Sequence, residues 1–251
     1  MNLVDLGAEL LNIASRLGWV RVERDLSYGA HERNRLDIYH PHRRQPGSPT
    51  LVFLYGGAWV KGSRQAYEFV GRAFAGRGYK TAIPDYRLLS HAPSGTAVVD
   101  VAQALGSIAE IDDEVILVGH SAGAQLGAAL AYERPKEARP IIRAFIGLAG
   151  PYRYVGEIVR GPLPPALLLS AGNDRLVRET EAGDFATRLR ERGVTVETRT
   201  YQRASHATLI GAVSPVLRSA APVLKDIEQF LSRLGQSVSQ DSRASPVSAA
   251  P

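Results

Sequence analysis

The sequence predicts an α/β fold, a mostly parallel sheet of about eight strands with helices on both faces. From residue 50 onward, short apolar segments alternate with longer segments of helical periodicity, which is the pattern of βα units. Several of these apolar segments are continuous, as expected for parallel strands that are buried on both faces. The chain has 251 residues, 45% of them hydrophobic, which is enough for a full core. We therefore expect a single domain over residues 1–234.

The N-terminal part of the chain predicts a helix, a hairpin and a first central strand. Residues 1–18 lack a basic start and are interrupted by charged residues, so they are typical of an amphipathic helix and not of a secretion signal. Residues 19–28 and 35–39 alternate apolar with polar residues around a turn at Gly29, which indicates an antiparallel hairpin. After a proline-rich connector, the continuous apolar segment at residues 50–55 predicts a central strand.

The following segments continue this alternation. Helices are expected at residues 64–76 and 95–110, directly after position 121, from residue 178, and at 215–234; strands are expected at 80–83, 115–118, 141–148, 166–170 and 195–200. Residues 149–165 form a long loop rich in Gly, Pro and Tyr, of the kind that covers or shapes a pocket. Residues 235–251 are rich in Ser, Ala and Pro and predict a disordered tail outside the domain.

The most informative segment joins a strand to a helix at a serine. The apolar strand at residues 115–118 runs into residues 119–123, whose sequence is GHSAG, and a run of small residues follows. This context predicts a sharp turn that strains the backbone of Ser121 and exposes its hydroxyl, while the two glycines avoid collisions with the flanking elements. The following helix directs its first N–H groups, that of Ala122 foremost, toward negative charge that forms beside the serine. The pattern predicts a serine nucleophile.

A glycine pair follows the strand at residues 50–55. Residues 55–59 read YGGAW, and adjacent glycines at the carboxyl end of a central strand let the backbone approach a ligand with free N–H groups. We expect this loop and Ala122 to supply two converging donors to an oxyanion. Each such donor lowers the barrier of acyl transfer by about 3 kcal/mol.

A serine hydroxyl becomes a nucleophile only with a base and an orienting carboxylate. Of the six histidines, His206 follows the last strand, at the carboxyl edge of the sheet where Ser121 also lies. It completes the chain order Ser, Asp, His. His120 adjoins the serine, but the sharp turn should direct it away. The other four lie before or between the early strands or in a loop.

Two aspartates lie between the serine and this histidine in the chain. Asp174 comes just past the end of a central strand, where its carboxylate can hold the histidine tautomer and stabilise the imidazolium. Asp184 falls within a helix and is interpreted as part of a solvated face. Asp85 also follows a strand, but it precedes the serine, and we expect it to hold its loop together with Tyr86 and Arg87.

Composition argues against several other classes of function. Without cysteine there are neither disulfides nor thiolate metal sites, which fits a reducing, cytoplasmic compartment. The net charge is +5, yet basic and acidic residues alternate along residues 178–192, so no nucleic acid partner is expected. No apolar run is long enough to span a bilayer, so no membrane partner is expected. His40 and His42 have no further ligands beside them, and no cofactor-binding glycine motif occurs, so neither metal nor cofactor is expected.

Together these residues resemble the α/β-hydrolase superfamily and, within it, the small carboxylesterases of the hormone-sensitive-lipase-like and kynurenine-formamidase-like groups. The resemblance extends over residues 35–234 and depends on residues 36–39, 55–59, 85–88, 119–123 and 172–174 and on His206. It implies the α/β-hydrolase fold. Carried over by position, Ser121 looks like the nucleophile, His206 the base, Asp174 the orienting acid, and the amides of Gly57, Ala58 and Ala122 the oxyanion donors.

One position departs from the family pattern. The glycine loop of the family usually opens with a histidine, and this chain has Tyr55 there. That histidine buttresses the loop and transfers no proton, so the oxyanion hole should survive with different supporting contacts. Ala58 at the third position favours the smaller esterases or formamidases over the lipases with three glycines. Trp59 and Tyr152 are expected to contact the substrate, and Tyr154 is a further candidate for lining the pocket.

The expected function is that of a serine esterase, which cleaves a carboxylic ester with a short acyl chain through an acyl-enzyme on Ser121. An arylformamidase acting on a formyl amide is the alternative, since no residue separates the two reactions. A ligand receptor with this fold would lack a triad member, and a lipase would carry a lid insertion that is not evident here. The expected partner is a small-molecule ester, and a homo-oligomer is left open.

Overall fold

The computed structural model describes residues 3–90, 92–93, 95–110, 112–133 and 141–244. Within this part of the chain, eight strands form one sheet in the order β1-β2-β4-β3-β5-β6-β7-β8. The strands are β1 (Arg21–Ser27), β2 (Arg35–His40), β3 (Thr50–Leu54), β4 (Thr81–Pro84), β5 (Glu114–His120), β6 (Ile141–Leu148), β7 (Ala166–Ala171) and β8 (Val196–Tyr201). Strand β2 is antiparallel to both β1 and β4, and all other neighbours are parallel. The predicted hairpin and the mostly parallel sheet are confirmed.

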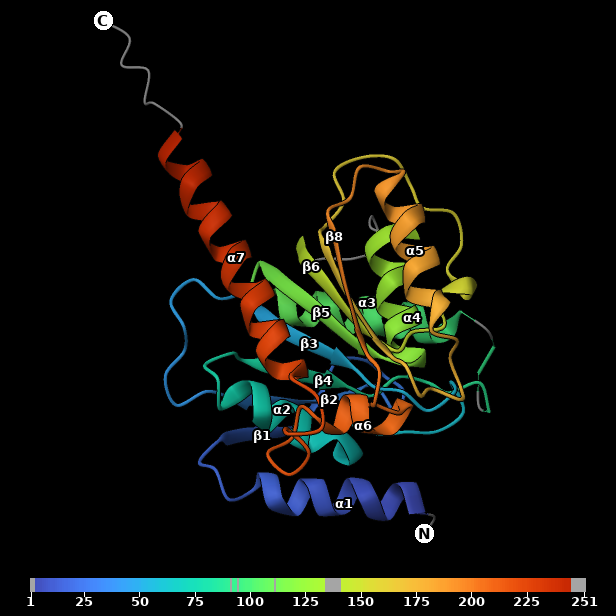
Figure 1. Ribbon diagram of the computed structural model, residues 1–251. Coiled ribbons are helices and arrows are strands. Elements are labelled where there is room, and N and C mark those ends of the chain that lie inside the picture. The colour runs from blue at the N-terminus through green and yellow to red at the C-terminus, as the bar shows by residue number, and fades with distance from the viewer. Residues whose placement is uncertain (1–2, 91, 94, 111, 134–140, 245–251) are drawn as a thin grey trace, which may run out of the picture.

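Helices cover both faces of this sheet (Figure 1). The helices are α1 (Leu3–Ser15), α2 (Glu68–Ala75), α3 (Thr96–Ala109), α4 (Ala122–Ala128), α5 (Thr180–Arg190), α6 (His206–Gly211) and α7 (Val223–Ala244). Helices α2 and α7 lie on one face, and α3, α4 and α5 lie on the other. Short 3-10 segments, η1 (Gln65–Tyr67) and η4 (Tyr152–Tyr154), precede α2 and follow β6. Because the strands from β4 to β8 in the sheet order are parallel, their carboxyl ends lie at one edge of the sheet, where the predicted site residues follow them.

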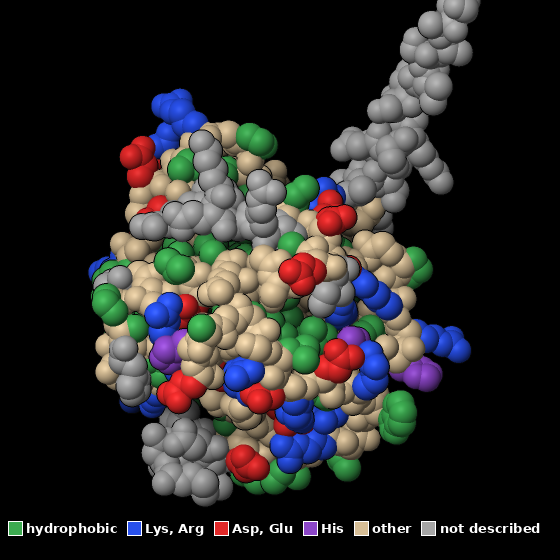
Figure 2. Space-filling model, turned by 180° about the vertical axis from the view of Figure 1, so that it is seen from behind, with side chains coloured by type: hydrophobic (Ala, Val, Ile, Leu, Met, Phe, Trp, Pro, Cys, Tyr) green, Lys and Arg blue, Asp and Glu red, His purple; other side chains and the backbone are tan. Residues whose placement is uncertain are grey.

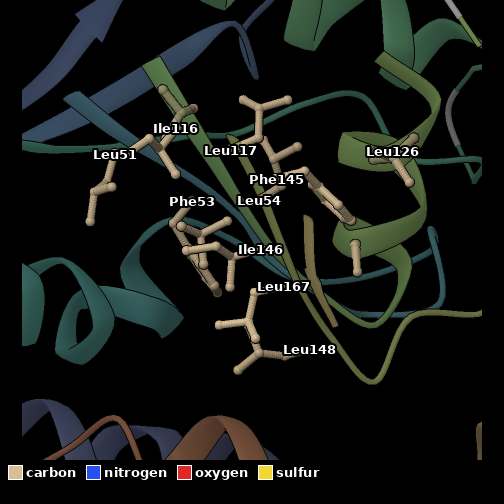
Figure 3. Packing of buried hydrophobic residues seen from close by; sticks show 14 of the residues in the cluster. Leu51, Phe53, Leu54, Ile116, Leu117, Leu126, Phe145, Ile146, Leu148 and Leu167 are labelled. Carbon is tan, nitrogen blue, oxygen red and sulfur yellow. The ribbon is translucent and has the colours of Figure 1, made fainter. Parts of the chain in front are cut away.

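The core lies between the central strands and the helices on either side. All five residues of β3 are buried, as its continuous apolar sequence predicts. Figure 3 shows side chains of the central strands on both faces of the sheet. Phe53, Ile146 and Leu167 lie on one face, and Leu117 and Phe145 lie on the other, toward Leu126 of α4. This packing fixes the end of β5, from which the candidate nucleophile projects.

The last helix differs from its sequence prediction at both ends. Helix α7 begins at Val223 and not at residue 215, because Pro222 restricts the preceding residue to extended backbone and suits the start of a helix. The helix then continues through Gly235 to Ala244, where the sequence predicted a disordered tail. No proline interrupts residues 223–244, so a single glycine costs only about 1 kcal/mol and does not end the helix. Residues 245–251 of the predicted tail lie outside the described residues, and the single-domain assignment stays a prediction.

Helix α1 lies outside α2, at the edge of the molecule (Figure 1). The Asn12 side chain ties it down, since its amide nitrogen donates to the carbonyl oxygen of Gln65 and its amide oxygen accepts from the N–H of Phe69, each at 2.9 Å. The predicted N-terminal helix is thus present over Leu3–Ser15. Among the residues that the structure describes, none of the helices combines the length and the apolar character that crossing a bilayer requires.

Charged side chains are distributed as the sequence predicts for solvated surfaces. On the face shown in Figure 2, basic and acidic side chains lie close to one another over much of the surface. Near the two ends of α5, Arg178 approaches Glu181 at 3.8 Å, and Arg192 reaches Glu157 at 3.5 Å. Arg188 and Arg190 instead donate to backbone carbonyl oxygens, so the basic residues of this segment have partners within the fold.

Candidate active site

The turn at Ser121 has the strained backbone that the sequence predicts. Its φ is 54° and its ψ is −124°, between the end of β5 and the start of α4. Such a conformation costs about 1–3 kcal/mol for a residue with a side chain. The flanking glycines are needed because a Cβ on Gly123 would lie 2.1 Å from the carbonyl oxygen of Leu54, and one on Gly119 would lie 2.5 Å from the Cα of Ala124. The turn leaves Ser121 partly exposed at the carboxyl edge of the sheet.

The glycine loop after β3 passes directly against this turn. A Cβ placed on Gly56 would lie 2.8 Å from the Cβ of Ser121, so only a glycine permits the approach. Gly57, Ala58 and Trp59 have φ values of 144°, 53° and 61°, which turn the loop back on itself. The carbonyl oxygen of Gly57 then accepts the N–H groups of residues 60 and 61, each at 3.1 Å.

The backbone N–H groups that the sequence assigns to an oxyanion hole are free. Within the described part of the chain, the N–H groups of Gly57 and Ala58 donate to no protein acceptor. That of Ala122 has no partner either, because Ala122 is the first residue of its helix. Free donors are what an oxyanion hole requires, and their assignment to one stays a prediction.

Asp174 and His206 meet across the end of the sheet. The Nδ1 of His206 lies 2.7 Å from the Oδ2 of Asp174, and the exposed fractions of the two side chains are 14% and 2%. The other carboxylate oxygen of Asp174 accepts the N–H groups of Leu176 at 2.8 Å and Val177 at 3.0 Å. This set of bonds leaves Oδ2 for the imidazole and favours the tautomer that carries its proton on Nδ1.

A capping box places His206 at the start of α6. The N–H of Ser205 donates to the hydroxyl of Thr208 at 2.7 Å, and the N–H of Thr208 donates back to the hydroxyl of Ser205 at 3.3 Å. The box fixes the direction in which the chain leaves β8 and enters the helix. His206, the first residue after the cap, is therefore held by both a helix start and a carboxylate.

His120 connects the nucleophile turn to the loop of the base. Its Nε2 lies 3.3 Å from the carbonyl oxygen of His206, and the two rings have centroids 4.8 Å apart. Within the described residues, the Ser121 hydroxyl itself makes no hydrogen bond. In enzymes without substrate, the bond between nucleophile and base is often long or poorly aligned and shortens on substrate binding.

His120 should make folding stability depend on pH. Burial lowers the pKa of His120 to about 3, and the neighbouring His206 acts in the same direction. Below pH 6.5 the unfolded chain binds a proton at this position that the folded protein does not bind, so stability is full above 6.5 and falls as pH decreases. We expect this residue to remove about 2 kcal/mol from the free energy of unfolding between pH 7 and pH 5.

Urea denaturation of the wild type and of His120→Gln at several pH values measures this effect. The unfolding free energy of the wild type minus that of His120→Gln should decrease by about 2 kcal/mol between pH 7 and pH 5. Replacement of the exposed His42 by glutamine serves as the control and should retain the pH dependence of the wild type. Parallel pH curves for wild type and His120→Gln would contradict the prediction.

Tyr55, which stands where the family has histidine, supports the glycine loop through its phenol. The phenol donates to the Oδ1 of Asp85 at 2.8 Å and accepts from the guanidinium of Arg33 at 2.9 Å. The Tyr86 hydroxyl donates to the carbonyl oxygen of Tyr55 at 2.6 Å, and the two rings stack with centroids 4.6 Å apart. Burial raises the pKa of the Tyr55 phenol, which keeps it protonated as a donor. Tyr55 therefore gives the glycine loop its own set of supporting contacts.

A buried arginine holds the carboxylate under Tyr55. Arg64 donates its backbone N–H to Asp85 at 2.7 Å and its Nε to Asp37 at 2.8 Å, and its guanidinium also contacts Asp85. The side chains of Arg64, Asp37 and Asp85 are 9%, 1% and 5% exposed. The expectation that Asp85 holds its loop together with Arg87 is wrong, because Arg87 pairs instead with Asp100 at 2.6 Å.

Arg33, Arg64 and Asp37 were not predicted as supporting residues. A usable signal was present at Asp37, an acid within an apolar strand, because a carboxylate buried at such a position requires a cationic partner. The sequence gives no hint of which arginine that partner is.

Of the two predicted substrate contacts, Trp59 lies at the border of the site and Tyr152 is buried in the core. Tyr152 is only 1% exposed and stacks on Phe185 of α5 with centroids 4.6 Å apart, so its assignment to a pocket is wrong. Tyr154 instead is 56% exposed and meets Trp59 edge to face at 5.7 Å. The indole N–H of Trp59 donates to Gln125 at 3.2 Å, one helical turn beyond the nucleophile. Trp59 therefore borders the site with Tyr154 beside it.

The groups that bind metals are not gathered at this edge. In the described part of the chain, no three His, Asp or Glu side chains are grouped so that they could hold a metal ion.

Sequence comparison connects the chain to known hydrolases. The family model BD-FAE matches residues 36–142, a span that contains Tyr55, the glycine loop and Ser121. A probable isoprenylcysteine alpha-carbonyl methylesterase of Oryza sativa subsp. japonica is 33% identical over 148 residues, which cover 53% of this chain and 36% of that protein. A kynurenine formamidase of Danio rerio is 29% identical over 110 residues, 41% of this chain and 36% of that protein. The matches thus cover about a third of each relative.

Similar solved structures match nearly the whole chain. Esterase B from Lactobacillus rhamnosis, inhibited by a tributyrin phosphonate, has a TM-score of 0.78 at 17% identity and covers 96% of each chain. An esterase from Pyrobaculum calidifontis has a TM-score of 0.74 at 20% identity, with 94% of this chain and 92% of that chain covered. At these identities the likeness establishes the architecture. The chain has the α/β-hydrolase fold, as its eight-stranded sheet and the strained serine turn at the end of β5 indicate.

Proposed function

We propose that this chain is a serine hydrolase that cleaves carboxylic esters through an acyl-enzyme on Ser121. The observation that carries the proposal is the contact of 2.7 Å between His206 and the buried Asp174, linked through His120 to the strained turn of the serine. Relatives named as a methylesterase and a formamidase, both of which cleave acyl bonds, support it over a third of their length. Homology alone does not extend to their substrates.

The reaction follows from the roles of these groups. His206 accepts the hydroxyl proton through Nε2, Asp174 stabilises the resulting imidazolium, and the oxygen of Ser121 bonds to the ester carbonyl carbon. The oxyanion of the tetrahedral intermediate accepts N–H groups of Gly57, Ala58 and Ala122, each worth about 3 kcal/mol of barrier. As the intermediate collapses, the bond to the alcohol breaks and His206 protonates the leaving oxygen. Water then attacks the acyl-enzyme by the same path and releases the acid and the free serine.

We also propose a short acyl chain. Support comes from the esterase of similar architecture whose inhibitor is a tributyrin phosphonate. The backbone of the glycine loop lies close against Ser121, and Trp59 with Tyr154 borders the site. A panel of p-nitrophenyl esters graded in acyl length should give the largest kcat/KM for short chains. A maximum at long chains would contradict this part of the proposal.

A formamidase is the second candidate, since a kynurenine formamidase is among the relatives. It would use the same residues, with His206 protonating a nitrogen leaving group. Comparison of kcat/KM for p-nitrophenyl acetate and for N-formylkynurenine decides between the two. A much larger value for the formamide would replace the esterase proposal.

Covalent labelling tests the shared mechanism. A fluorophosphonate probe should form an adduct on the peptide that contains Ser121 and none on Ser121→Ala. The matched control Ser107→Ala changes a serine of α3 and should label like the wild type. A receptor without catalysis would give no adduct in any of the three proteins, and this result would end the proposal.

A further inference from the structure

The outer face of α1 and the turn after it expose large apolar side chains. Leu10, Ile13, Leu17 and Trp19 are 59%, 54%, 91% and 88% exposed. Leu10 and Ile13 are three residues apart on α1 and share one side of it, while Leu17 and Trp19 follow the end of the helix. We call these four residues the apolar strip. Covering such side chains would remove their apolar surface from water, which favours binding.

The same helix turns polar side chains inward. Asn12 and Ser15 are 2% and 6% exposed, and Asn12 is bonded to the segment before α2. A surface helix normally buries its apolar side and exposes its polar side. In α1 the inner side carries Asn12 and Ser15 beside Leu11, which packs against the core, while Leu10 and Ile13 stay exposed.

A groove of about 1110 Å³ adjoins this apolar strip, with Leu17 and Trp19 on its border. Its charged lining consists of basic residues alone: His42, Arg43, Arg44, Arg72, Arg77 and Arg218. Asp112, Glu68 and Glu228, outside the lining, pair with Arg44, Arg72 and Arg77.

Two arginines of the groove have no acidic partner. Arg43 and Arg218 are exposed, and neither forms an ion pair within the described residues. The exposed acid Glu9 on α1 lies near Arg16, whose guanidinium pairs with Glu68 at 2.7 Å. The groove beside Leu17 and Trp19 therefore carries two arginines without an acidic partner.

We propose that α1 and this groove bind the surface of a bilayer that contains anionic lipids. The apolar strip would enter the boundary between head groups and acyl chains, with Trp19 at the depth that tryptophan prefers, while Arg43 and Arg218 face the lipid phosphates. Charge decides between this occupant and a second copy of the chain, because two copies joined along α1 would bring two basic grooves together. This proposal departs from the expectation of no membrane partner, which depended only on the absence of a spanning segment; binding at a surface needs no such segment.

Tryptophan fluorescence provides the test, since the chain has only two tryptophans. In Trp59→Phe the remaining Trp19 should shift its emission to the blue on vesicles of phosphatidylcholine with phosphatidylglycerol. Phosphatidylcholine alone should give a far smaller shift, and added salt should reverse the shift. Brominated acyl chains in the mixed vesicles should quench the fluorescence of Trp19.

Vesicle sedimentation of the full chain gives the energetic readout. Arg43→Glu and Arg218→Glu should each lower the partition coefficient on mixed vesicles at least about fivefold, and Leu17→Ser about tenfold. The controls are Arg203→Glu and Ile141→Ser, which change an exposed arginine and an exposed apolar residue outside the lining of the groove. They should bind like the wild type. Ser121→Ala should also bind normally, so failure of the esterase proposal would leave this result unchanged.

Other outcomes would overturn the proposal. Equal binding of neutral and mixed vesicles, or absence of binding to both, would contradict the role of the basic groove. Dimerisation seen by light scattering and abolished by Leu17→Ser would assign the apolar strip to a second copy of the chain.

Discussion

Replacing Asp174 with asparagine should lower kcat for ester hydrolysis by about four orders of magnitude. The carboxylate accepts the Nδ1–H of His206 at 2.7 Å while its other oxygen accepts two backbone N–H groups. In the asparagine variant, the amide oxygen can keep the backbone bonds and the amide NH₂ then faces His206. The ring would then hold its proton on Nε2, where it cannot accept the proton of Ser121.

The matched control is Asp184→Asn, which changes an exposed aspartate of α5. Steady-state kinetics on a short p-nitrophenyl ester should give wild-type kcat for this variant. Circular dichroism and denaturation should show both variants folded, since the asparagine retains the turn at position 174. If Asp174→Asn kept more than a tenth of the wild-type kcat, the assignment of the orienting acid would be wrong.

Replacing Arg64 with methionine should lower the free energy of unfolding by about 3–5 kcal/mol. The change leaves the nearly inaccessible carboxylates of Asp37 and Asp85 without their main cation, and an unpaired buried charge is costly. It also frees the carboxylate that accepts the Tyr55 phenol, so the glycine loop should lose support. We therefore expect reduced esterase activity along with the loss of stability.

Guanidinium denaturation measures the loss. Arg64→Lys, which keeps the charge but not the forked geometry, should fall between methionine and wild type and supplies a readout if the methionine variant fails to fold. The control is Arg199→Met, whose arginine is 49% exposed and pairs with Glu197 at 3.2 Å; it should cost less than about 1 kcal/mol. Equal stability of Arg64→Met and Arg199→Met would show that the buried cluster contributes little.

The fold was predictable because its signals are local. A continuous apolar strand such as β3 is recognisable without its neighbours, and the sharp turn at Ser121 follows from the glycines and small residues around it. The start of α7 was missed although the signal was local too, since Pro222 is a helix-start residue within an apolar segment.

Contacts between distant segments were not predictable in the same way. Whether Tyr152 faces a pocket or the core depends on Phe185, a residue of a helix that comes after the next strand. The partner of Asp37 is Arg64, and several other arginines in this arginine-rich chain would have served equally well from the sequence. Pairing across the fold depends on packing geometry, which periodicity does not encode.

The link between His120 and the carbonyl of His206 has a consequence for how the molecule tolerates change. It anchors the start of α6 to the sheet itself, so the separation of the reacting groups does not depend on the turns at residues 212–222 that follow. Exchange of the exposed Tyr154 of η4, which lies beside Trp59, can reshape the approach to the serine while the reactive geometry is kept. The fold thus separates the part of the chain that performs chemistry from the parts in which selectivity can evolve.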